Sequence, residues 1–161
     1  MDPRAEALIR ELGLLPHPEG GHYRELYRSP LQVDPPDGRG DRAALTTIYF
    51  LLPAAEISRW HRVTSEEVWH HLEGAPLELF VSDPDLLHVQ RHLLGPLRDG
   101  LVPEVVVPPG HWQAARSSGA YSLVGCVVAP GFDFADFAML RDIPTAGGLL
   151  RQRQPGFVDL L

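Results

Sequence analysis

Short runs of alternating apolar and polar residues, each bounded by Gly, Pro, Asp or Ser, fill the chain from residue 44 to 129. This period of two is typical of strands with one buried face. The runs are 44–52, 57–62, 67–74, 77–83, 86–94, 104–108, 111–116 and 121–129, and residues 22–29 form an earlier one. No helical pattern separates them, so we expect an all-β sandwich or barrel and not a parallel α/β sheet.

Helical patterns occur only at the two ends of the chain. At the N-terminus, Asp2 can cap a helix, Pro3 suits its first position and Gly13 can end it, which predicts a helix over residues 2–13. Its apolar stripe is Ala5, Leu8, Ile9 and Leu12. The pattern after residue 143 indicates a weak helix near 145–154.

The chain shows no internal repeat and no boundary that would divide it, so we expect a single domain over residues 1–161. Within it, the barrel should span about residues 20–140, followed by a C-terminal tail over 141–161. Residues 34–42 are a polar Pro/Gly loop, which we expect to be a mobile flap.

Composition excludes several classes of function. The formal net charge of −7 disfavours binding to a nucleic-acid polymer, and no apolar run approaches the ~20 residues that cross a membrane. The N-terminal residues do not resemble a signal peptide, so we expect a cytoplasmic protein. The chain has one cysteine, Cys126, which excludes an internal disulfide and a multi-Cys zinc site. It has no lysine, which excludes Schiff-base chemistry and the P-loop lysine.

The densest chemistry lies in SRWHRVTSEEVWHHLEG, residues 58–74. In a strand that begins at Glu67, the side chains of Glu67, Trp69 and His71 share one face. If His61 also points inward, His61 and Glu67 can meet across the turn between their strands. A carboxylate beside an imidazole produces a general base or acid, and the same two groups could bind a divalent metal.

Aromatic side chains could complete a ligand pocket around this pair. Trp69 and Trp112 flank it in sequence together with Trp60, and stacking on a sugar or nucleobase is a use for one of them. Tyr49 lies in a strand whose inward face the sequence does not identify. If the face of Tyr49 lines the barrel, its phenol could act as a proton donor opposite a histidine base.

Strand 22–29 carries both acidic and basic side chains. Strict alternation puts Glu25 on one face and Arg24 and Arg28 on the other. Either the strand closes the barrel and contributes Glu25 to the site, or its arginines bind an anionic ligand. A third reading is an exposed edge strand at a dimer interface. Cys126 lies in an apolar run, so we expect a buried, inert thiol.

These motifs resemble those of the cupin superfamily, whose first motif reads G-x5-H-x-H-x3,4-E-x6-G and whose second reads G-x5-P-x-G-x2-H-x3-N. His61, Glu67 and Gly74 occupy the His, Glu and closing Gly positions of the first motif. Pro108 and Gly110 match the P-x-G of the second. The resemblance implies a pocket at the mouth of a β-barrel.

Two positions depart from the cupin pattern. Val63 stands where the second metal-binding His would be, and Gln113 stands where the His of the second motif would be. If a metal binds, the resemblance implies His61, Glu67 and Gln113 as its ligands, with a water and His71 as candidates to complete the set. The sequence therefore indicates no specific cofactor, and a divalent metal is the alternative.

The chain also resembles one small cupin group of largely uncharacterised function, over about residues 8–140. The shared segments include LGLLPHPEGGHYRELYRS, TTIYFLL, SRWHRVTSEEVWHHLEG, PPGHWQAA and SLVGCVVAPGFDFADF. The resemblance implies a double-stranded β-helix, that is, a jelly-roll barrel, and a homodimer. It does not imply a reaction, because one fold hosts many functions.

Three hypotheses of function follow. The first is a metal-independent isomerase or epimerase for a small carbohydrate or nucleotide sugar, with His61 as base, Glu67 as its support and Tyr49 or another acid as donor. The second is a small-molecule binding protein without catalysis. The third is a metal enzyme with an incomplete ligand set. Under each of them, Glu25, Trp69, His71, Trp112 and Gln113 are the candidate ligand-binding residues.

Overall fold

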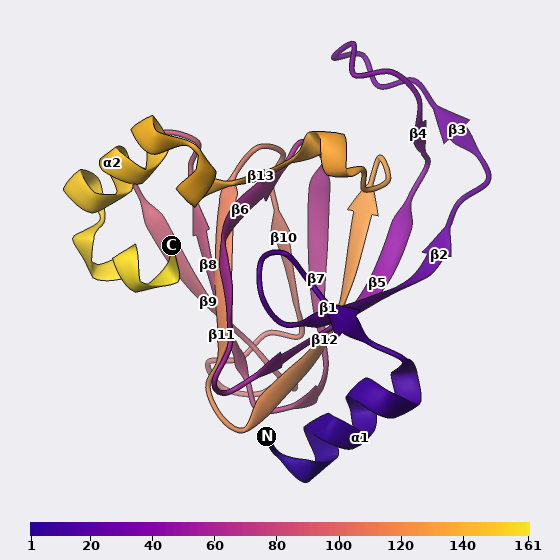
Figure 1. The fold of residues 1–161 in the computed structure, drawn as a ribbon, viewed down its shortest axis with the longest axis vertical. Coiled ribbons are helices and arrows are strands. Elements are labelled where there is room, and N and C mark those ends of the chain that lie inside the picture. Colours follow the sequence, from indigo (N-terminus) through magenta and orange to yellow (C-terminus); the bar gives the residue numbers. More distant parts are fainter.

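The computed structural model describes residues 1–161 and shows two antiparallel sheets that face each other (Figure 1). From β5 onward the chain passes back and forth between them. Strands β5, β7, β10 and β12 lie in one sheet, and β6, β8, β9 and β11 lie in the other. This arrangement is a double-stranded β-helix, as the resemblance to cupins implies, and it agrees with the sandwich or barrel that the alternating runs predict.

The six-stranded sheet has the order β1–β2–β5–β12–β7–β10. Its strands are β1 Leu15–Pro16, β2 His22–Arg28, β5 Thr46–Pro53, β12 Tyr121–Ala129, β7 Glu66–Gly74 and β10 Glu104–Val107. The five-stranded sheet has the order β13–β6–β11–β8–β9. Its strands are β13 Phe137–Met139, β6 Ile57–Val63, β11 Trp112–Ser117, β8 Leu77–Ser82 and β9 Val89–Leu94. Every longer strand lies inside a predicted run or within a residue of one, whereas the short strands β1 and β13 carry no pattern of their own.

Helix α1, Pro3–Leu12, confirms the N-terminal prediction. The Asp2 carboxylate accepts hydrogen bonds from the backbone N–H groups of Arg4 and Ala5, and Gly13 ends the helix with φ of 63°. Glycine adopts this left-handed backbone conformation without steric cost, because it has no Cβ. The helix packs its apolar stripe against the outer face of the six-stranded sheet, and the cluster comprises Ala5, Leu8, Leu14, Leu51 and Leu123.

The C-terminal tail forms helix α2, Pro144–Arg153, and a 3₁₀ helix, Pro155–Leu160, after two shorter 3₁₀ turns at Phe134–Asp136 and Leu140–Asp142. These helices cover the outer face of the five-stranded sheet, and Leu150 and Leu160 bury Trp60 and Trp112 there. Helices α1 and α2 have ten residues each, too short to cross a membrane.

The predicted loop 34–42 lies at the tip of a two-stranded hairpin, β3 Gln32–Val33 and β4 Arg42–Ala43. Figure 1 shows this hairpin projecting from the barrel beside β2 and β5. The hairpin was not predicted, since two-residue strands leave no alternation to detect.

The barrel interior has a packed half and a hollow half. In the packed half, apolar side chains from both sheets meet without exposure, among them Leu52, Leu77, Leu79 and Leu94. Phe50, Trp69 and Cys126 belong to this core and also line the cavity that occupies the other half. They therefore form the floor of the cavity.

Candidate functional site

The cavity has a volume of about 280 Å³ and is lined by eighteen residues from both sheets and from the chain segments around its mouth. Aromatic and aliphatic side chains make up part of its wall, among them Ile48, Phe50, Val63 and Trp69. The polar lining residues are His17, Glu19, Tyr23, Glu25, Arg28, Thr46, His61, Glu67, Cys126 and Asp133. Glu19, His61 and Glu67 are buried, whereas Glu25 and Arg28 are exposed, so ionisable groups lie both deep in the cavity and at its mouth.

His61 projects into the cavity from β6 and has both ring nitrogens in polar contacts. Its Nδ1 lies 2.7 Å from the Arg59 carbonyl oxygen, so this nitrogen carries a proton. Its Nε2 lies 3.1 Å from Oε2 of Glu19. Phe137 stacks on the ring with centroids 5.5 Å apart. Burial lowers the pKa of His61 because the apolar surroundings disfavour the imidazolium, although Glu67 nearby opposes this shift.

Glu19 is a functional candidate that the sequence did not identify. It lies in the turn between β1 and β2, where its Oε1 accepts a 2.7 Å hydrogen bond from the Ser58 hydroxyl. Burial raises the pKa of Glu19. Because Nδ1 of His61 is already protonated, Nε2 of the neutral ring can only accept. Burial of both groups favours their neutral forms, in which the acid form of Glu19 donates to Nε2, so the 3.1 Å contact holds one proton between these two residues.

The Gly20–Gly21 pair allows this turn to press against the barrel. A Cβ at Gly20 would lie 2.0 Å from the Ile57 carbonyl oxygen, and one at Gly21 would lie 2.8 Å from the Phe50 ring. Both glycines also have positive φ, 109° and 73°. The density of Glu, His and Gly in PHPEGGH was visible in the sequence, but its partner, His61, was not.

His17 extends the same cluster toward Tyr23. Its Nδ1 accepts a 3.3 Å hydrogen bond from the backbone N–H of Glu19 and lies 3.3 Å from Oε2 of that residue. Its ring packs edge-on against Tyr23. Burial lowers the pKa of His17, so desolvation favours the neutral form of both histidines in the cavity.

Glu67 is the second deep carboxyl, and neighbouring strands fix its position. Its Oε2 accepts a 2.5 Å hydrogen bond from the amide nitrogen of Gln113, whose Oε1 accepts a 2.8 Å bond from the Trp69 indole. The Cys126 thiol also donates to Glu67. Burial raises the pKa of Glu67 to about 7, and Glu19 adds to this shift, while His61, Gln113 and Cys126 oppose it. The carboxyl is therefore divided between acid and carboxylate near neutral pH.

The residues present do not fit a resident metal. Oε1 of Gln113 faces Trp69, and Nε2 of His61 faces Glu19. Val63, at the position of the missing histidine, lines the cavity with an apolar side chain. Nowhere in the chain do three His, Cys, Asp or Glu side chains converge in a metal-binding arrangement. The polar atoms of the three conditional metal ligands are thus engaged with protein partners, His61 with Arg59 and Glu19, and Glu67 with Gln113.

Four predicted site residues lie outside the cavity lining, and the fourth, Gln113, contacts it only through Glu67. Tyr49 faces outward because its neighbours Ile48 and Phe50 take the inward positions of β5, and it packs beside α1. Trp112 is also outward, buried under the C-terminal helices, with its indole donating to the Pro84 carbonyl. Neither can contact a ligand held in the cavity.

The third is His71, which shares the buried face of β7 with Glu67 and Trp69. It lies beyond Trp69, in the packed half, and is 9% exposed. Its Nε2 is 3.1 Å from the Ala75 carbonyl oxygen, which makes it a structural histidine. Trp69 is in the cavity wall as predicted, whereas Gln113 lies behind Glu67 and positions it.

A β-bulge decides which residues of β2 face the cavity. The pairing with β5 shifts register between Glu25 and Tyr27, so Leu26 is the extra residue. Strict alternation predicts opposite faces for Glu25 and Arg28, but the bulge brings both to the cavity and the prediction for Arg28 was wrong. The guanidinium Nε of Arg28 donates to Oε1 of Glu25 at 2.8 Å.

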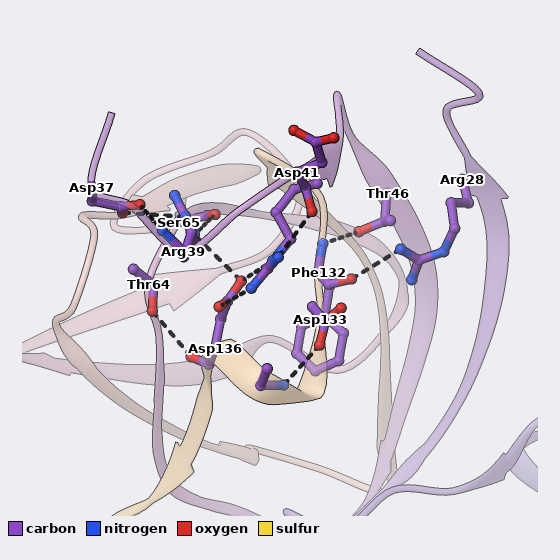
Figure 2. Close-up of polar contacts among 12 residues, drawn as sticks. Arg28, Asp37, Arg39, Asp41, Thr46, Thr64, Ser65, Phe132, Asp133 and Asp136 are labelled. Atoms are coloured by element: carbon purple, nitrogen blue, oxygen red, sulfur yellow. Dashed lines mark hydrogen bonds and ion pairs between the residues drawn. The ribbon is translucent and has the colours of Figure 1, made fainter. Parts of the chain in front are cut away.

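Residues 130–137, which we call the lid loop, cover part of the mouth and contribute Phe132, Asp133, Phe134 and Phe137 to the wall. Figure 2 shows how polar contacts fasten this loop. The Arg42 guanidinium makes two 2.8 Å hydrogen bonds to the Asp136 carboxylate, and Arg39 lies 3.5 Å from it. These arginines come from the β3–β4 hairpin, so the predicted flap is tied to the lid loop.

Comparisons with known proteins agree with this architecture. The Cupin_5 model, described as Cupin superfamily (DUF985), matches residues 6–140. The chain is 30% identical over 152 residues to the uncharacterized protein YML079W of Saccharomyces cerevisiae, covering 84% of this chain and 75% of the yeast protein.

Two solved structures are also similar. A hypothetical protein from Leishmania major has 35% identity and a TM-score of 0.83, over 97% of this chain and 95% of that one. Protein SO0799 from Shewanella oneidensis has 34% identity and a TM-score of 0.83, over 98% and 96%. Since the family model spans most of the chain and the barrel carries its motifs, this protein belongs to the Cupin_5 family of the cupin superfamily.

Proposed function

We propose that this protein binds a small polar molecule of the carbohydrate class in the cavity and catalyses a metal-independent proton transfer, as an isomerase or epimerase. One observation carries the proposal. Glu67, a buried carboxyl with a pKa of about 7, and the proton-sharing pair Glu19–His61 line the same enclosed cavity. A general base is most effective when its pKa lies near the working pH.

The three groups divide the reaction between them. The Glu67 carboxylate takes a proton from the carbon next to a substrate carbonyl, and the C–H electron pair moves into a new C=C bond. The proton held between Glu19 and His61 passes to the carbonyl oxygen, giving a neutral enediol. Return of the proton from Glu67 to the neighbouring carbon, with loss of a hydroxyl proton to the pair, completes an isomerisation. This scheme differs from the hypothesis drawn from the sequence in two ways: Glu67 and not His61 is the base, and Glu19 with His61 replaces the outward-facing Tyr49 as the acid.

Neighbouring residues hold these acid and base groups in position. Gln113 and Cys126 hold Glu67, while the Arg59 carbonyl fixes the tautomer of His61. Trp69 both supports Gln113 and forms part of the cavity floor, where a sugar ring could stack. Positioning of this kind is what an acid–base site requires before substrate arrives.

Solvent exchange tests the proposal directly. The protein is incubated in D₂O with a panel of aldoses and ketoses, and NMR follows deuterium incorporation beside the carbonyl. Glu67→Gln and His61→Gln should each lower the exchange rate about 10²- to 10⁴-fold, the usual contribution of a general acid or base. Glu104→Gln, which changes an exposed carboxylate outside the cavity, should leave the rate unchanged. Exchange that survives Glu67→Gln in folded protein would contradict the assignment.

A second candidate is ligand binding without chemistry. It is favoured by the fact that His61 and Glu67 already have protein partners, as the groups of a passive binding pocket can. Under this alternative, panel members raise the melting temperature of the protein but acquire no deuterium. Binding and exchange measured on the same compounds therefore separate the two functions.

A further inference from the structure

Acidic side chains outnumber basic ones in the cavity wall. The Glu25 and Asp133 carboxylates line it together with Glu67, whose pKa is about 7, against a single arginine, Arg28. Burial favours the neutral acid form of the fourth carboxyl, Glu19. The two histidines add little positive charge, since burial favours their neutral forms. An anionic ligand would therefore depend on Arg28.

Arg28 is already committed to protein partners. Its Nε and Nη2 donate to the two carboxylate oxygens of Glu25, at 2.8 and 3.1 Å, and its Nη1 donates to the Phe132 carbonyl at 3.1 Å. This two-point contact neutralises the guanidinium and occupies the edge that would otherwise match a phosphate. The contact to Phe132 appears in Figure 2.

Several backbone N–H groups at the mouth are also engaged with protein partners. In the lid loop, the N–H of Gly131 donates to the Ala43 carbonyl, that of Phe132 to the Thr46 hydroxyl, and that of Ala135 to Asp133. An anion-binding nest needs several such groups pointing at the ligand. The mouth offers carboxylate and carbonyl oxygens instead.

The volume of the cavity limits ligand size. The volume of about 280 Å³ lies just below the usual range for drug-sized ligands. A free sugar of five or six carbons approaches this volume. A nucleotide-linked sugar is larger than this volume and would have to extend out of the mouth.

From the paired arginine, the excess of carboxyl groups and the volume, we infer that the cavity selects small uncharged hydroxycarbonyl compounds and rejects their phosphorylated or nucleotide-linked counterparts. The inference rests on the proposed function for the hydroxycarbonyl character, whereas the selection against anions follows from Glu25, Arg28 and Asp133. It narrows the carbohydrate class of the proposal to free sugars and related ketones.

Matched pairs of probes test it by titration calorimetry and thermal shift. The pairs are dihydroxyacetone, ribose and fructose with their terminal phosphates. Each neutral member should bind at least about tenfold more tightly than its phosphate. Repulsion between the phosphate and a single carboxylate at the mouth is enough to produce a difference of that size. Glu25→Gln removes the charge that neutralises Arg28 and should bring the phosphates within about threefold of the neutral probes. Glu104→Gln should not.

The inference is overturned if a phosphate binds as tightly as its neutral partner in the unchanged protein, or if no neutral probe binds. Its failure is separable from failure of the proposed function. Neutral probes that bind without deuterium exchange contradict only the catalysis, and exchange on a phosphorylated probe contradicts only the charge selection.

Discussion

The two halves of the barrel interior use the same strands but are filled differently. Along β7, Glu67 faces the cavity, Trp69 forms the floor, and His71 lies in the packed half. Along β5, Ile48 lines the cavity and Leu52 is fully buried in the core. One strand thus serves both tasks, with the change occurring over about four residues.

The comparison teaches where this fold tolerates buried ionisable groups. In the packed half, leucine and valine side chains exclude water and contribute most of the apolar burial. In the hollow half, Glu19, His61 and Glu67 are buried at a cost, which appears as shifted pKa values. A region that pays stability in this way is a candidate for function.

The largest expected effect on stability belongs to the packed half. Leu79→Ala should lower the free energy of unfolding by about 2 to 5 kcal/mol, because the surrounding residues cannot fill the space left by a fully buried leucine. Urea denaturation measures the loss. Proton exchange on the sugar panel, assayed where the variant is folded, should be retained.

A matched pair of valines sharpens this comparison. Val107 is 1% exposed in the core, whereas Val63 is 5% exposed and borders the cavity. Val107→Ala should therefore destabilise the protein more than Val63→Ala. Equal losses would mean that the hollow half is as tightly packed as the other.

A pH-dependent effect of up to about 3 kcal/mol is expected for Glu67→Gln. The pKa of Glu67 is raised from 4.5 to about 7, and each pKa unit is worth about 1.4 kcal/mol. Below pH 4.5 the carboxyl is protonated in both the folded and unfolded states. As the pH rises from 4.5 to 7, Glu67 ionises in the unfolded state before it does so in the folded state. The wild-type protein therefore loses stability over this range, whereas the variant does not.

Denaturation curves of both proteins between pH 4 and 8 test this expectation. The difference in the free energy of unfolding between the variant and the wild-type protein should shift in favour of the variant as the pH rises from 4 toward 7. A difference in stability that is constant across this range would show that Glu67 titrates normally.

The smallest effect should come from the lid loop. Asp136→Asn removes the charge that faces Arg42 and Arg39, and we expect a loss of about 1 to 2 kcal/mol for these partly buried bonds. Hydrogen exchange at residues 130–137 should become faster, while exchange in β8 stays unchanged. Asp142→Asn, which alters an exposed carboxylate, is the control.

If backbone hydrogen exchange in the Asp136→Asn variant were as slow as in the wild-type protein, the lid loop would be held by its phenylalanines and not by the arginines. The pKa of Asp136 is lowered, chiefly by its hydrogen bonds to Arg42. Its contribution is therefore present above the ordinary carboxyl pKa and is lost as the pH falls through the lowered value.

The elements predicted best were those with local signals. Helix α1 follows from Asp2, Pro3 and Gly13, each of which acts within one turn of the chain. The strands follow from alternation, and the cupin motifs add the order in which they pair. The outward position of Trp112 could have been derived, because its neighbour Gln113 takes the inward position.

Other parts of the site could not be derived from local sequence. Alternation divides β5 into two faces but does not say which is inward, so Tyr49 was placed on the wrong side. The bulge at Leu26 reverses the phase of β2 and leaves no composition signal. Glu19 gains its role only from His61, which reaches it from another strand.

The sequence by itself determined the strand-rich fold and the N-terminal helix, and its motifs brought His61 and Glu67 forward as residues of the cavity, because periodicity and motif spacing are properties of the chain. Only the tertiary structure decided that the cavity holds a shared proton between Glu19 and His61, and that Gln113 braces a carboxyl. These depend on distances between strands that are remote in sequence, and on burial, which shifts a pKa only after the barrel has closed around the group.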